Sequence, residues 1–578
     1  MYNLTRYLKE YKKECWFAPL FKMLEALFEL TVPLVIAYMI DDGIKKDSSR
    51  VIALSFFILI LLAAVGLAVS CTAQYFAAKA ATGFSKGLRH DLFAHILTFG
   101  FSEVDNVGTS TLITRMTSDV NILQNGVNMF LRLFLRSPFI VIGAMVMAFT
   151  IDAKSALTFV AVIFALSVFV YLVTATNIPL LKSAQKKLDD VLCLVRENLS
   201  GARVIRAFTR EDESVDSFMH TNSDLTKLQL AAGKISGLLN PVTYVMINLA
   251  IACLIYIGNR RVAAGAITTG MVVALYNYMS QILIELIKFA NLIVTMNRSL
   301  ASAARVNEIF DIRPSMTDAH DGKEIEVKED VPIVEFKDVS LRYHEDADEA
   351  VSNISFKLMP SETLGIIGGT GAGKSTVASL MARFYDASSG EVLIAGKNIK
   401  DIDISKLRRF VGVIMQTAVL FEGSIRDNMK WGCKDASDEE ILEAIEAAVC
   451  SEVVKEKGGL DAMIEAGGRN LSGGQRQRLS IARVLTARPR VLILDDSASA
   501  LDYLTDKKLR ENISKLSYDP AVVIIAQRTI SVEDCDNILV LDDGEAVGFG
   551  PHEKLLKTCE TYREIYASQH EDMKAEDE

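Results

Sequence analysis

Long apolar stretches recur six times in the N-terminal half of the sequence, each long enough for the roughly 20 apolar residues that carry a helix across a bilayer. They cover residues 15–40, 51–82, 129–150, 155–178, 235–257 and 268–297. The connections after the first, third and fifth stretches are short, whereas those after the second and fourth contain about fifty residues each. These two connections are charged but keep a helical apolar period, so we expect the helices to continue well beyond the bilayer. Both chain termini are predicted to share the side of the two long connections.

The pattern changes after residue 310. Residues 311–331 are polar and lack an apolar period, which predicts a linker. From residue 333 the sequence IVEFKDVSLRY alternates as a strand, and strands and helices then follow in the manner of an α/β domain. The last ten residues, QHEDMKAEDE, predict a disordered acidic tail. The expected organisation is a membrane domain over 1–310, a linker over 311–331, an α/β domain over 332–568 and a tail over 569–578.

Composition supports a membrane protein and argues against some partners. Half of the residues are hydrophobic and the mean hydropathy is +0.25, which is rare in a soluble chain of this size. The net charge is −10, and no run of Lys and Arg indicates a nucleic-acid partner. None of the eight cysteines forms a CxxC pair or flanks a His cluster, so we expect reduced thiols. Residues 1–14 mix apolar and basic positions and predict an interfacial helix on the inner leaflet.

A phosphate-binding loop is the clearest motif in the chain. The segment TLGIIGGTGAGKST (363–376) contains G-x-x-x-x-G-K-S at 368–375, between an apolar strand pattern and a helix pattern. Its glycines let backbone N–H groups approach phosphates closely, and the start of the following helix adds a favourable dipole. Lys374 can neutralise β- and γ-phosphate oxygens, and Ser375 can bind Mg²⁺. ATP and Mg²⁺ are therefore the expected cofactors, with a chance glycine-rich turn as the alternative.

Two further motifs follow in the α/β domain. RVLILDDSASALD (490–502) reads as a buried strand that ends in carboxylates, and Asp495 is placed to hold Mg²⁺ through water. LSGGQRQRLSIARVL (471–485) is a glycine-rich turn that runs into a helix pattern. Taken alone, this segment indicates a helix start capped by Ser472.

Together these motifs resemble the ATP-binding cassette (ABC) family, and specifically its exporters with six spans fused to one cassette, over essentially the whole chain. The resemblance implies an α-helical six-span transmembrane domain of the type IV exporter kind plus an α/β P-loop nucleotide-binding domain. It implies a Walker A loop at 368–375, a Walker B aspartate at 495, a signature motif at 471–475 and a D-loop at 499–502. The residues implied to contact ATP, with Tyr343 stacking on the base, are Tyr343, Gly368, Gly369, Thr370, Gly371, Ala372, Gly373, Lys374, Ser375, Thr376, Gln416, Ser472, Gly473, Gly474 and Gln475. The implied Mg²⁺ ligands are Ser375, Gln416 and Asp495.

The resemblance also implies a location and a partner. A cytoplasmic cassette makes the chain a multi-pass cell-membrane protein with both termini in the cytoplasm, although basic residues such as Lys45 and Arg261 fall in loops placed outside. Segments 108–120 and 196–211 resemble the two cytoplasmic loops whose short coupling helices press on the cassettes. In the family two cassettes dimerise head to tail, and each ATP lies between one Walker A loop and the other chain's signature motif. A second chain is therefore required.

The site departs from the family pattern at two positions. The residue after the Walker B aspartate is usually Glu, the general base, and here it is Asp496. Its carboxylate lies about 1.5 Å further back, beyond good hydrogen-bond reach of the attacking water. The usual switch His is replaced by Gln527, which donates a hydrogen bond but carries no positive charge. Both changes weaken the phosphoryl-transfer step, and neutral drift in a working enzyme is the alternative interpretation.

We interpret the chain as the degenerate half of a heterodimeric exporter. It would bind ATP at its own Walker A loop and lend its intact signature motif to a partner half-transporter that has the Glu and the His. One alternative is a homodimeric exporter with two weakened sites. Another is an ATP-binding regulatory subunit or channel that transports nothing.

Ionisable residues also occur within the predicted spans. Glu25 and Glu29 lie one helical turn apart on the first span, and Glu285 and Lys288 do so on the sixth. These residues, with nearby Tyr276, Asn277, Tyr278 and Gln281, either line a substrate cavity or form local contacts, such as an intrahelical Glu285–Lys288 ion pair. We favour local contacts. Arg132 and Arg136 are expected to snorkel at the cytoplasmic end of the third span.

Overall fold

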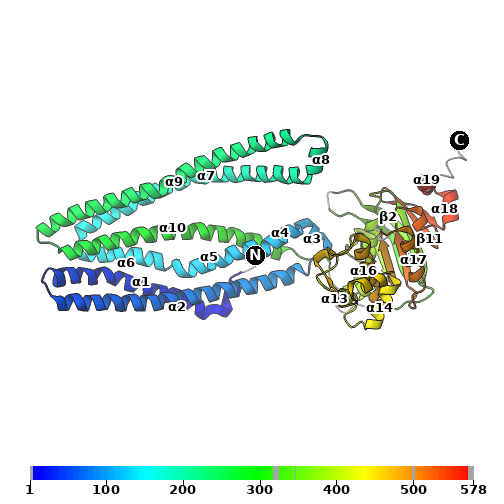
Figure 1. The fold of residues 1–578 in the computed structure, drawn as a ribbon, viewed down its shortest axis with the longest axis horizontal. Helices are drawn as coiled ribbons and strands as arrows, with labels where there is room; N and C mark the ends of the chain where they lie inside the picture. The colour runs from blue at the N-terminus through cyan, green and yellow to red at the C-terminus, as the bar shows by residue number, and fades with distance from the viewer. Residues whose placement is uncertain (1–3, 317–324, 345–346, 497–500, 571–578) are drawn as a thin grey trace. The chain divides into compact units, whose positions relative to one another are not determined.

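The computed structural model describes residues 4–316, 325–344, 347–496 and 501–570, and the chain forms two compact units (Figure 1). The helical unit comprises Met1–Leu97 and Ser110–Asp311. The α/β unit comprises Thr98–Thr109 and Ile312–Glu578. The short segment 98–109 therefore belongs with the α/β unit, although it lies between two long helices of the helical unit in the sequence.

Within the described residues, six helical runs are long and apolar enough to cross a membrane. They are Leu4–Ile44, Ser49–Ile96, Thr109–Ile151, Ala153–Ser200, Glu211–Ala263 and Thr269–Asp311. The 48-residue run Ser49–Ile96 is about 72 Å long at the usual helical rise, against about 30 Å for the hydrocarbon core of a bilayer. The six predicted spans are confirmed, and so is their extension beyond the bilayer.

Several runs are assembled from more than one helix. The elements in chain order are η1 (Leu4–Tyr11), α1 (Lys12–Tyr38), η2 (Met39–Ile44), α2 (Ser49–Ile96), α4 (Thr109–Thr114), η3 (Arg115–Asp119), α5 (Val120–Leu133), α6 (Arg136–Ile151), α7 (Ala153–Ser200), α8 (Ala202–Ala207), α9 (Glu211–Ala263) and α10 (Thr269–Asp311). Helices α7 and α9 lie side by side (Figure 1). The third run is broken between α5 and α6, where Pro138 lies in the first turn of α6 and can leave its missing N–H unpaired without cost.

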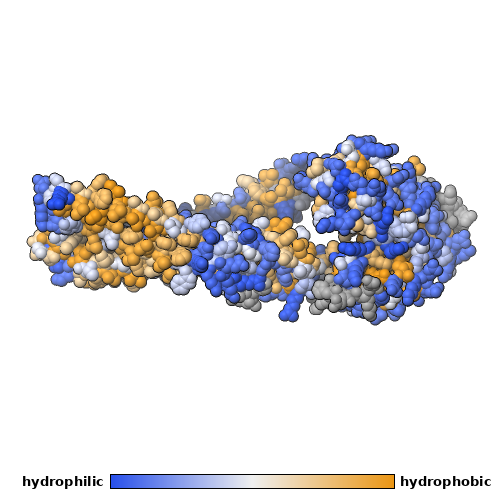
Figure 2. Space-filling model, turned by 90° about the horizontal axis from the view of Figure 1, so that it is seen from below, coloured by the Kyte–Doolittle hydropathy of each residue, from blue (hydrophilic) through white to orange (hydrophobic). Residues whose placement is uncertain are grey.

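Small residues let helices α1, α6 and α10 approach closely. Ala144 and Ala148 of α6 are buried with Leu30 of α1 and Tyr278 of α10. A Cβ on Gly143 would lie only 2.5 Å from Cδ1 of Leu30, so this crossing favours glycine. Many large apolar side chains of the long helices are instead exposed, and Figure 2 shows the orange surface that they form. An apolar surface of this extent suits hydrocarbon better than water.

The short loops between runs hold locally paired charges. Asp41 pairs with Lys45 at 3.1 Å and accepts a hydrogen bond from the backbone N–H of Gly270 at 3.1 Å. Asp152, at the turn between α6 and α7, pairs with Arg261 of α9 at 2.8 Å. Lys45, Lys46 and Arg261 in these loops are thus paired with neighbouring carboxylates. This pairing is a physical reason why counting Lys and Arg gave only partial support to the predicted topology.

The two long connections end in short helices at their tips. In the second, α8 (Ala202–Ala207) lies inside the segment 196–211 that resembled a coupling loop. In the first, the short helix is α3 (Phe101–Val107), which ends just before the segment 108–120 that resembled a coupling loop. At the start of α3 the backbone N–H of Gly100 donates to Oε2 of Glu103 at 2.8 Å, and Gly108, with φ of +80°, ends the helix. Residues after Gly108 instead begin the returning helix.

The α/β unit is built on two main sheets. Their strands are β1 (Val334–Leu341), β2 (Val351–Leu358), β3 (Thr363–Gly368), β4 (Ser389–Ile394), β5 (Lys397–Asn398), β6 (Val411–Ile414), β9 (Val491–Asp495), β10 (Ala521–Ile525), β11 (Asn537–Asp542) and β12 (Glu545–Gly550). The antiparallel sheet has the order β2-β1-β4-β5, and the six-stranded sheet has the order β12-β11-β3-β10-β9-β6. A small third sheet pairs β7 (Gly423–Ser424) with β8 (Met463–Ile464).

Helices cover these sheets (Figure 1). They are α11 (Lys374–Met381), α12 (Ile404–Phe410), α13 (Ile425–Lys430), α14 (Asp438–Ala447), α15 (Ser451–Lys457), α16 (Gly473–Thr486), α17 (Tyr503–Ile513), α18 (His552–Thr558) and α19 (Glu560–Gln569), with 3₁₀ turns η4 (Ile399–Asp401), η5 (Ala466–Gly468) and η6 (Thr529–Ser531). The predicted combination of a six-span helical domain and an α/β domain is confirmed.

The parallel strands of the six-stranded sheet decide where a ligand can bind. Strand β10 pairs in parallel with β3 and β9, and β6 pairs in parallel with β9. Strands β3 and β9 are apolar and almost fully buried, as expected for a sheet covered on both faces. The carboxyl ends of β3, β10, β9 and β6 therefore meet at one edge, which is where open α/β sheets bind their ligands.

Candidate nucleotide site

The glycine-rich loop joins strand β3 to helix α11 at the carboxyl edge of the sheet. Gly373 has φ of +89°, and a Cβ there would lie 2.5 Å from Cγ1 of Val351. Only glycine fits this position without a shift of its neighbours. Lys374 folds back over the loop, and its Nζ donates to the carbonyl oxygens of Gly368 at 2.9 Å and Gly369 at 2.6 Å. The loop thus keeps the shape and the cation that phosphate binding requires.

A pocket of about 370 Å³ lies beside this loop. It is lined by residues from the loop, from α11 and from the segments that follow β6, β9 and β10. The predicted site residues that line it are Tyr343, Thr370, Gly371, Gly373, Lys374, Ser375, Thr376, Gln416, Asp495, Asp496 and Gln527. Ala372 is buried within the loop, and Gly368 and Gly369 are connected to the pocket through Lys374.

Three of these residues offer oxygen ligands for a divalent cation. The hydroxyl of Ser375 donates to Oδ1 of Asp495 at 3.0 Å, and the amide of Gln416 lines the same pocket. A hydroxyl, a carboxylate and an amide oxygen suit Mg²⁺, which also takes ligands from nucleotide phosphates. Within the described ranges no three His, Cys, Asp or Glu side chains are grouped to hold a metal alone. The residues present therefore fit Mg²⁺ bound together with a nucleotide.

Burial perturbs the charged groups of the pocket. It raises the pKa of Asp495 above its ordinary value, and the charge of Asp496 acts in the same direction, while the hydrogen bond from Ser375 opposes it. Burial also lowers the pKa of Lys374, against the attraction of the two carboxylates. Both shifts disfavour the charged forms of these two groups. A ligand that brings anionic oxygens and a divalent cation would stabilise both charges.

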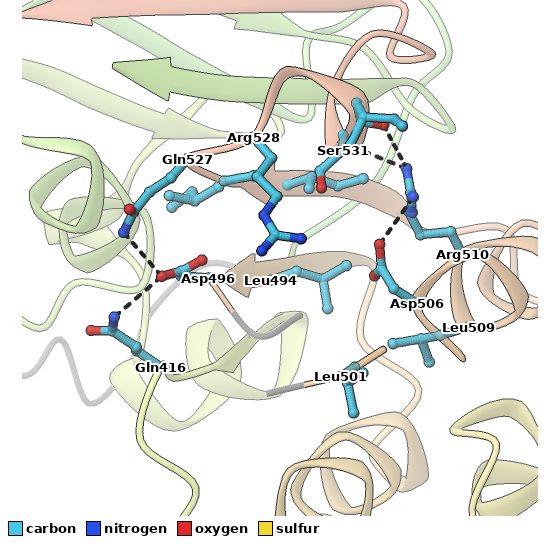
Figure 3. Close-up of a pocket in the computed structure, with 14 residues that line it drawn as sticks. Gln416, Leu494, Asp496, Leu501, Asp506, Leu509, Arg510, Gln527, Arg528 and Ser531 are labelled. Carbon is cyan, nitrogen blue, oxygen red and sulfur yellow. Dashed lines mark hydrogen bonds and ion pairs between the residues drawn. The ribbon is translucent and has the colours of Figure 1, made fainter. Parts of the chain in front are cut away.

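Asp496 is held by two amide side chains (Figure 3). Its Oδ2 accepts hydrogen bonds from Nε2 of Gln416 and from Nε2 of Gln527, each at 3.2 Å. Its backbone has φ of 44° and donates to the carbonyl oxygen of Ile525 at 3.0 Å. The side chain of Arg528, which sequence reasoning did not single out, lines a second pocket, which Asp496 also lines (Figure 3). The two positions that depart from the family pattern are therefore in direct contact.

An aromatic cluster connects the pocket to α3. Tyr343, with its side chain partly exposed, shares a hydrogen bond with the hydroxyl of Thr376 at 3.0 Å. Its ring meets the ring of Tyr385 edge-on, with centroids 4.9 Å apart. The hydroxyl of Tyr385 donates to Oδ2 of Asp105 in α3 at 2.5 Å. Sequence reasoning missed Tyr385 and Asp105, and the only signal was an aromatic pair directly after the helix that follows the phosphate loop.

The signature residues form a capped helix start away from this pocket. Ser472 and Gln475 exchange hydrogen bonds at the beginning of α16, with distances of 3.0 and 3.3 Å. Neither they nor Gly473 and Gly474 line the pocket built around Lys374. The expected D-loop lies partly outside the described residues, and its described end, Asp502, caps α17 through the N–H of Thr505.

The helical unit contains a buried ion network where α1, α6 and α10 meet. Arg136, at the start of α6, is 6% exposed and pairs with Glu29 at 2.9 Å and with Glu285 at 2.8 Å. Glu285 also pairs with Lys288 at 2.7 Å, and Lys22 pairs with Glu25 at 2.5 Å. The predicted intrahelical pair on α10 is present.

The prediction that Arg136 snorkels was wrong. Snorkelling needs a path to water for the guanidinium, and here three carboxylates surround it, because Glu25 also lies 3.8 Å from it. Pairing inside the bundle compensates the charge without exposing it. Arg132, one turn earlier, is half-buried, and within the described residues it has no ion pair.

Comparisons with known proteins agree with this architecture. A family model described as the ABC transporter transmembrane region matches residues 15–286, and the ABC transporter model matches residues 351–499. The chain is 35% identical over 571 residues to YfiB, an ABC transporter ATP-binding protein of Bacillus subtilis, with 98% of both chains covered. It is 32% identical over 574 residues to the ABC transporter ATP-binding protein Rv1273c of Mycobacterium tuberculosis, covering 98% of this chain and 97% of that one.

A solved structure shares the fold. The bacterial Atm1-family ABC exporter with ATP bound superposes with a TM-score of 0.79 at 22% identity, over 96% of this chain and 98% of that chain. Together with the six spans and the ATP-binding domain, these matches decide the family. The chain belongs to the ABC transporters, as a half-transporter in which a six-span membrane domain of exporter type is fused to one ATP-binding cassette.

Proposed function

We propose that this half-transporter exports its substrate as one half of a heterodimer, and that its own nucleotide site binds ATP but hydrolyses it slowly. The observation that carries the proposal is the contact between Asp496 and Gln527, at the two positions where the family has Glu and His. In a complete site a longer carboxylate accepts a proton from the attacking water while a histidine stabilises the transferring phosphoryl group. Here the shorter carboxylate of Asp496 accepts a hydrogen bond from the neutral amide of Gln527.

Binding does not depend on these two positions. The backbone N–H groups of the glycine-rich loop and Lys374 would hold the phosphates, and Tyr343 would stack on the base. Ser375, Gln416 and Asp495 would hold Mg²⁺, which neutralises phosphate charge when bound. We therefore expect ATP affinity close to that of a complete site.

ATP hydrolysis, in contrast, does depend on the residues at positions 496 and 527. Oδ2 of Asp496 already accepts two N–H···O bonds, which makes it a weaker acceptor for the proton of water. Gln527 supplies a donor but no charge for the developing transition state. A positioned general base contributes about 10²–10⁴-fold to such a rate, so a loss within that range is expected at this site.

The partner chain would complete a second, active site. Ser472, Gly473, Gly474 and Gln475 would face ATP bound to the partner's Walker A loop, and hydrolysis there would drive the cycle of alternating access. The direction of transport is proposed as export because the helical unit has the exporter layout. A homodimer of this chain would instead contain two copies of the weakened site.

Turnover by the purified chain tests the proposal. The wild-type chain, the D496E/Q527H variant and a K374A variant would be reconstituted in the same lipid, with ATP binding and ATP hydrolysis measured separately. We expect wild type to bind ATP and hydrolyse it slowly, D496E/Q527H to hydrolyse at least tenfold faster, and K374A to lose binding. Because the signature motif is intact, a dimer of the repaired chain contains two complete sites.

Two outcomes would contradict the proposal. Brisk hydrolysis by the wild-type chain alone would show that Asp496 and Gln527 are tolerated, and the homodimer would replace the heterodimer. No gain from D496E/Q527H, in a variant that still binds ATP and forms dimers, would show that these two residues do not limit the rate.

A further inference from the structure

The helical unit contains an apolar groove beside its N-terminal segment. The groove has a volume of about 610 Å³ and lies between η1, the first turns of α1, and the facing parts of α5 and α10. Its walls include Leu8 of η1, Val127 and Phe130 of α5, and Leu300 of α10. A volume of this size is typical of pockets that hold a small amphipathic molecule.

Helix packing keeps the groove open and preformed. Ser299 of α10 donates to the carbonyl oxygen of Ile122 at 3.1 Å, which holds α10 against α5 along the base of the groove. Tyr7 fixes η1 from the other side, because its hydroxyl donates to Asp91 of α2 at 2.9 Å and its ring meets that of Phe84 edge-on. The N-terminal segment is thus a tethered wall of the groove.

The mouth of the groove is basic. Lys9 and Lys12 both line it and are exposed, and in the described part of the chain neither has an ion-pair partner. Of the other charges on this segment, Arg6 pairs with Asp91 and Glu14 pairs with Lys79 at 2.9 Å, whereas Glu10 and Lys13 are exposed and do not line the groove. Two free ammonium groups therefore stand beside an apolar cavity.

Trp16 lies one turn beyond Lys12 at the same mouth. It lines the groove and is 80% exposed. Exposed Trp side chains are characteristic of the boundary between lipid headgroups and hydrocarbon. At such a boundary, apolar walls suit acyl chains and ammonium groups suit headgroup phosphates.

We propose that this groove binds one acidic phospholipid from the leaflet on the N-terminal side of the membrane. The phosphate lies between Lys9 and Lys12, and an acyl chain follows α5 and α10 past Phe130. A purely apolar partner would make no use of the two ammonium groups, and a free phosphate would not cover the apolar walls. Each lysine near an anionic headgroup contributes about 1 kcal/mol, which is roughly a fivefold preference per lysine.

Tryptophan quenching can test the site directly. The chain has two tryptophans, and Trp431 stacks on Phe421 in the α/β unit, so a W431F chain reports on Trp16 alone. This full-length chain would be reconstituted in vesicles that contain increasing fractions of brominated phosphatidylglycerol or brominated phosphatidylcholine. We expect half-maximal quenching at an at least fivefold lower fraction of the acidic lipid.

Matched variants separate the groove from general surface charge. K9Q/K12Q should bring the difference between the two lipids below twofold, whereas K13Q, an exposed neighbour outside the groove, should leave it unchanged. A303F, which fills the groove, should reduce quenching by the acidic lipid. A304F, an exposed position next to it that does not line the groove, should not.

Four outcomes would overturn the proposal. The first is equal quenching by both lipids in the wild-type background. The second is an effect of K13Q as large as that of K9Q/K12Q, which would indicate diffuse attraction. The third is a Trp16 that neither lipid quenches, which would show that protein, such as a second copy of this chain, covers the groove. The fourth is displacement of the acidic lipid by inorganic phosphate at constant ionic strength, which would reduce the site to an anion site.

Discussion

Replacing Arg136 by Met should destabilise the helical unit strongly. The guanidinium is buried and bridges Glu29 of α1 and Glu285 of α10, at 2.9 and 2.8 Å. Removing one partner of a buried ion pair costs about 3–5 kcal/mol. The lower end applies here, because Glu285 keeps Lys288 at 2.7 Å and the hydroxyl of Ser137 at 2.9 Å.

The double variant R136M/E285Q separates the charge from the packing. The glutamine can still accept from Ser137. Of the groups that lose a partner, Glu29 and Lys288 each have side chains 42% exposed and can be solvated, and Glu25 keeps Lys22 at 2.5 Å. We therefore expect the double variant to recover most of the lost stability. Non-additivity of this kind is the signature of a direct interaction.

The measurement is the apparent melting temperature of the full-length chain in one detergent and lipid mixture, followed by loss of the soluble monodisperse peak. A cost of about 3 kcal/mol corresponds to a fall of roughly 6 °C for a unit of this size. R132M is the control, since Arg132 has no ion pair within the described residues. The reasoning is refuted if R136M melts within 2 °C of wild type, or if the double variant melts no higher than R136M.

Three further predictions concern the α/β unit. Y385F removes one hydrogen bond to α3, worth about 1.5 kcal/mol. Backbone hydrogen exchange of peptides covering 101–107 should therefore become roughly tenfold faster. An unchanged exchange rate would show that this hydrogen bond does not hold α3. Burial raises the pKa of Cys450 to about 11 and that of Cys535 to about 12. The neutral thiols therefore stabilise the fold below the unfolded-state pKa of about 8.5. This stabilisation is lost as the pH rises through the pKa values of the folded state. Both thiols should therefore resist iodoacetamide at pH 8.5 until the chain is unfolded, as mass spectrometry of the labelled peptides can check. G373A should lower the stability of the nucleotide-free chain by about 2 kcal/mol or more, whereas G369A, where a Cβ meets nothing within 4 Å, should leave thermal unfolding almost unchanged.

Local patterns predicted most of the fold. Six apolar stretches became six spans because burial in a bilayer depends on an unbroken run of residues, which a sequence displays directly. The glycine-rich loop could also be predicted from the sequence, because strand, loop and helix are consecutive and Gly373 occupies a conformation that only glycine fits. The alternation after residue 333 likewise became strand β1.

Contacts between distant segments could not be predicted in the same way. Arg136 meets Glu285 across 149 positions of the chain, and nothing in either neighbourhood indicates that α6 and α10 cross there. The pairing of Asp496 with Gln527 follows from the order of β9 and β10 in the sheet, and so it needed the fold. The bounds of the helix at the first loop tip could not be predicted, because this helix depends on the turn residues Gly100 and Gly108 and not on an apolar period.

The assignment of α3 to the α/β unit has a practical consequence for dissecting this protein. Phe101 stacks on Phe384 with centroids 4.6 Å apart, and Tyr385 is bound to Asp105. Cutting the chain at residue 312 would therefore remove a piece of the cassette's own surface and leave two half-buried aromatic rings facing water. Such a fragment should self-associate through these exposed rings. Adding residues 98–109 as a peptide should restore its solubility. The cassette is thus built from two separate segments of the chain. Exchanging cassettes between half-transporters would require exchanging residues 98–109 as well.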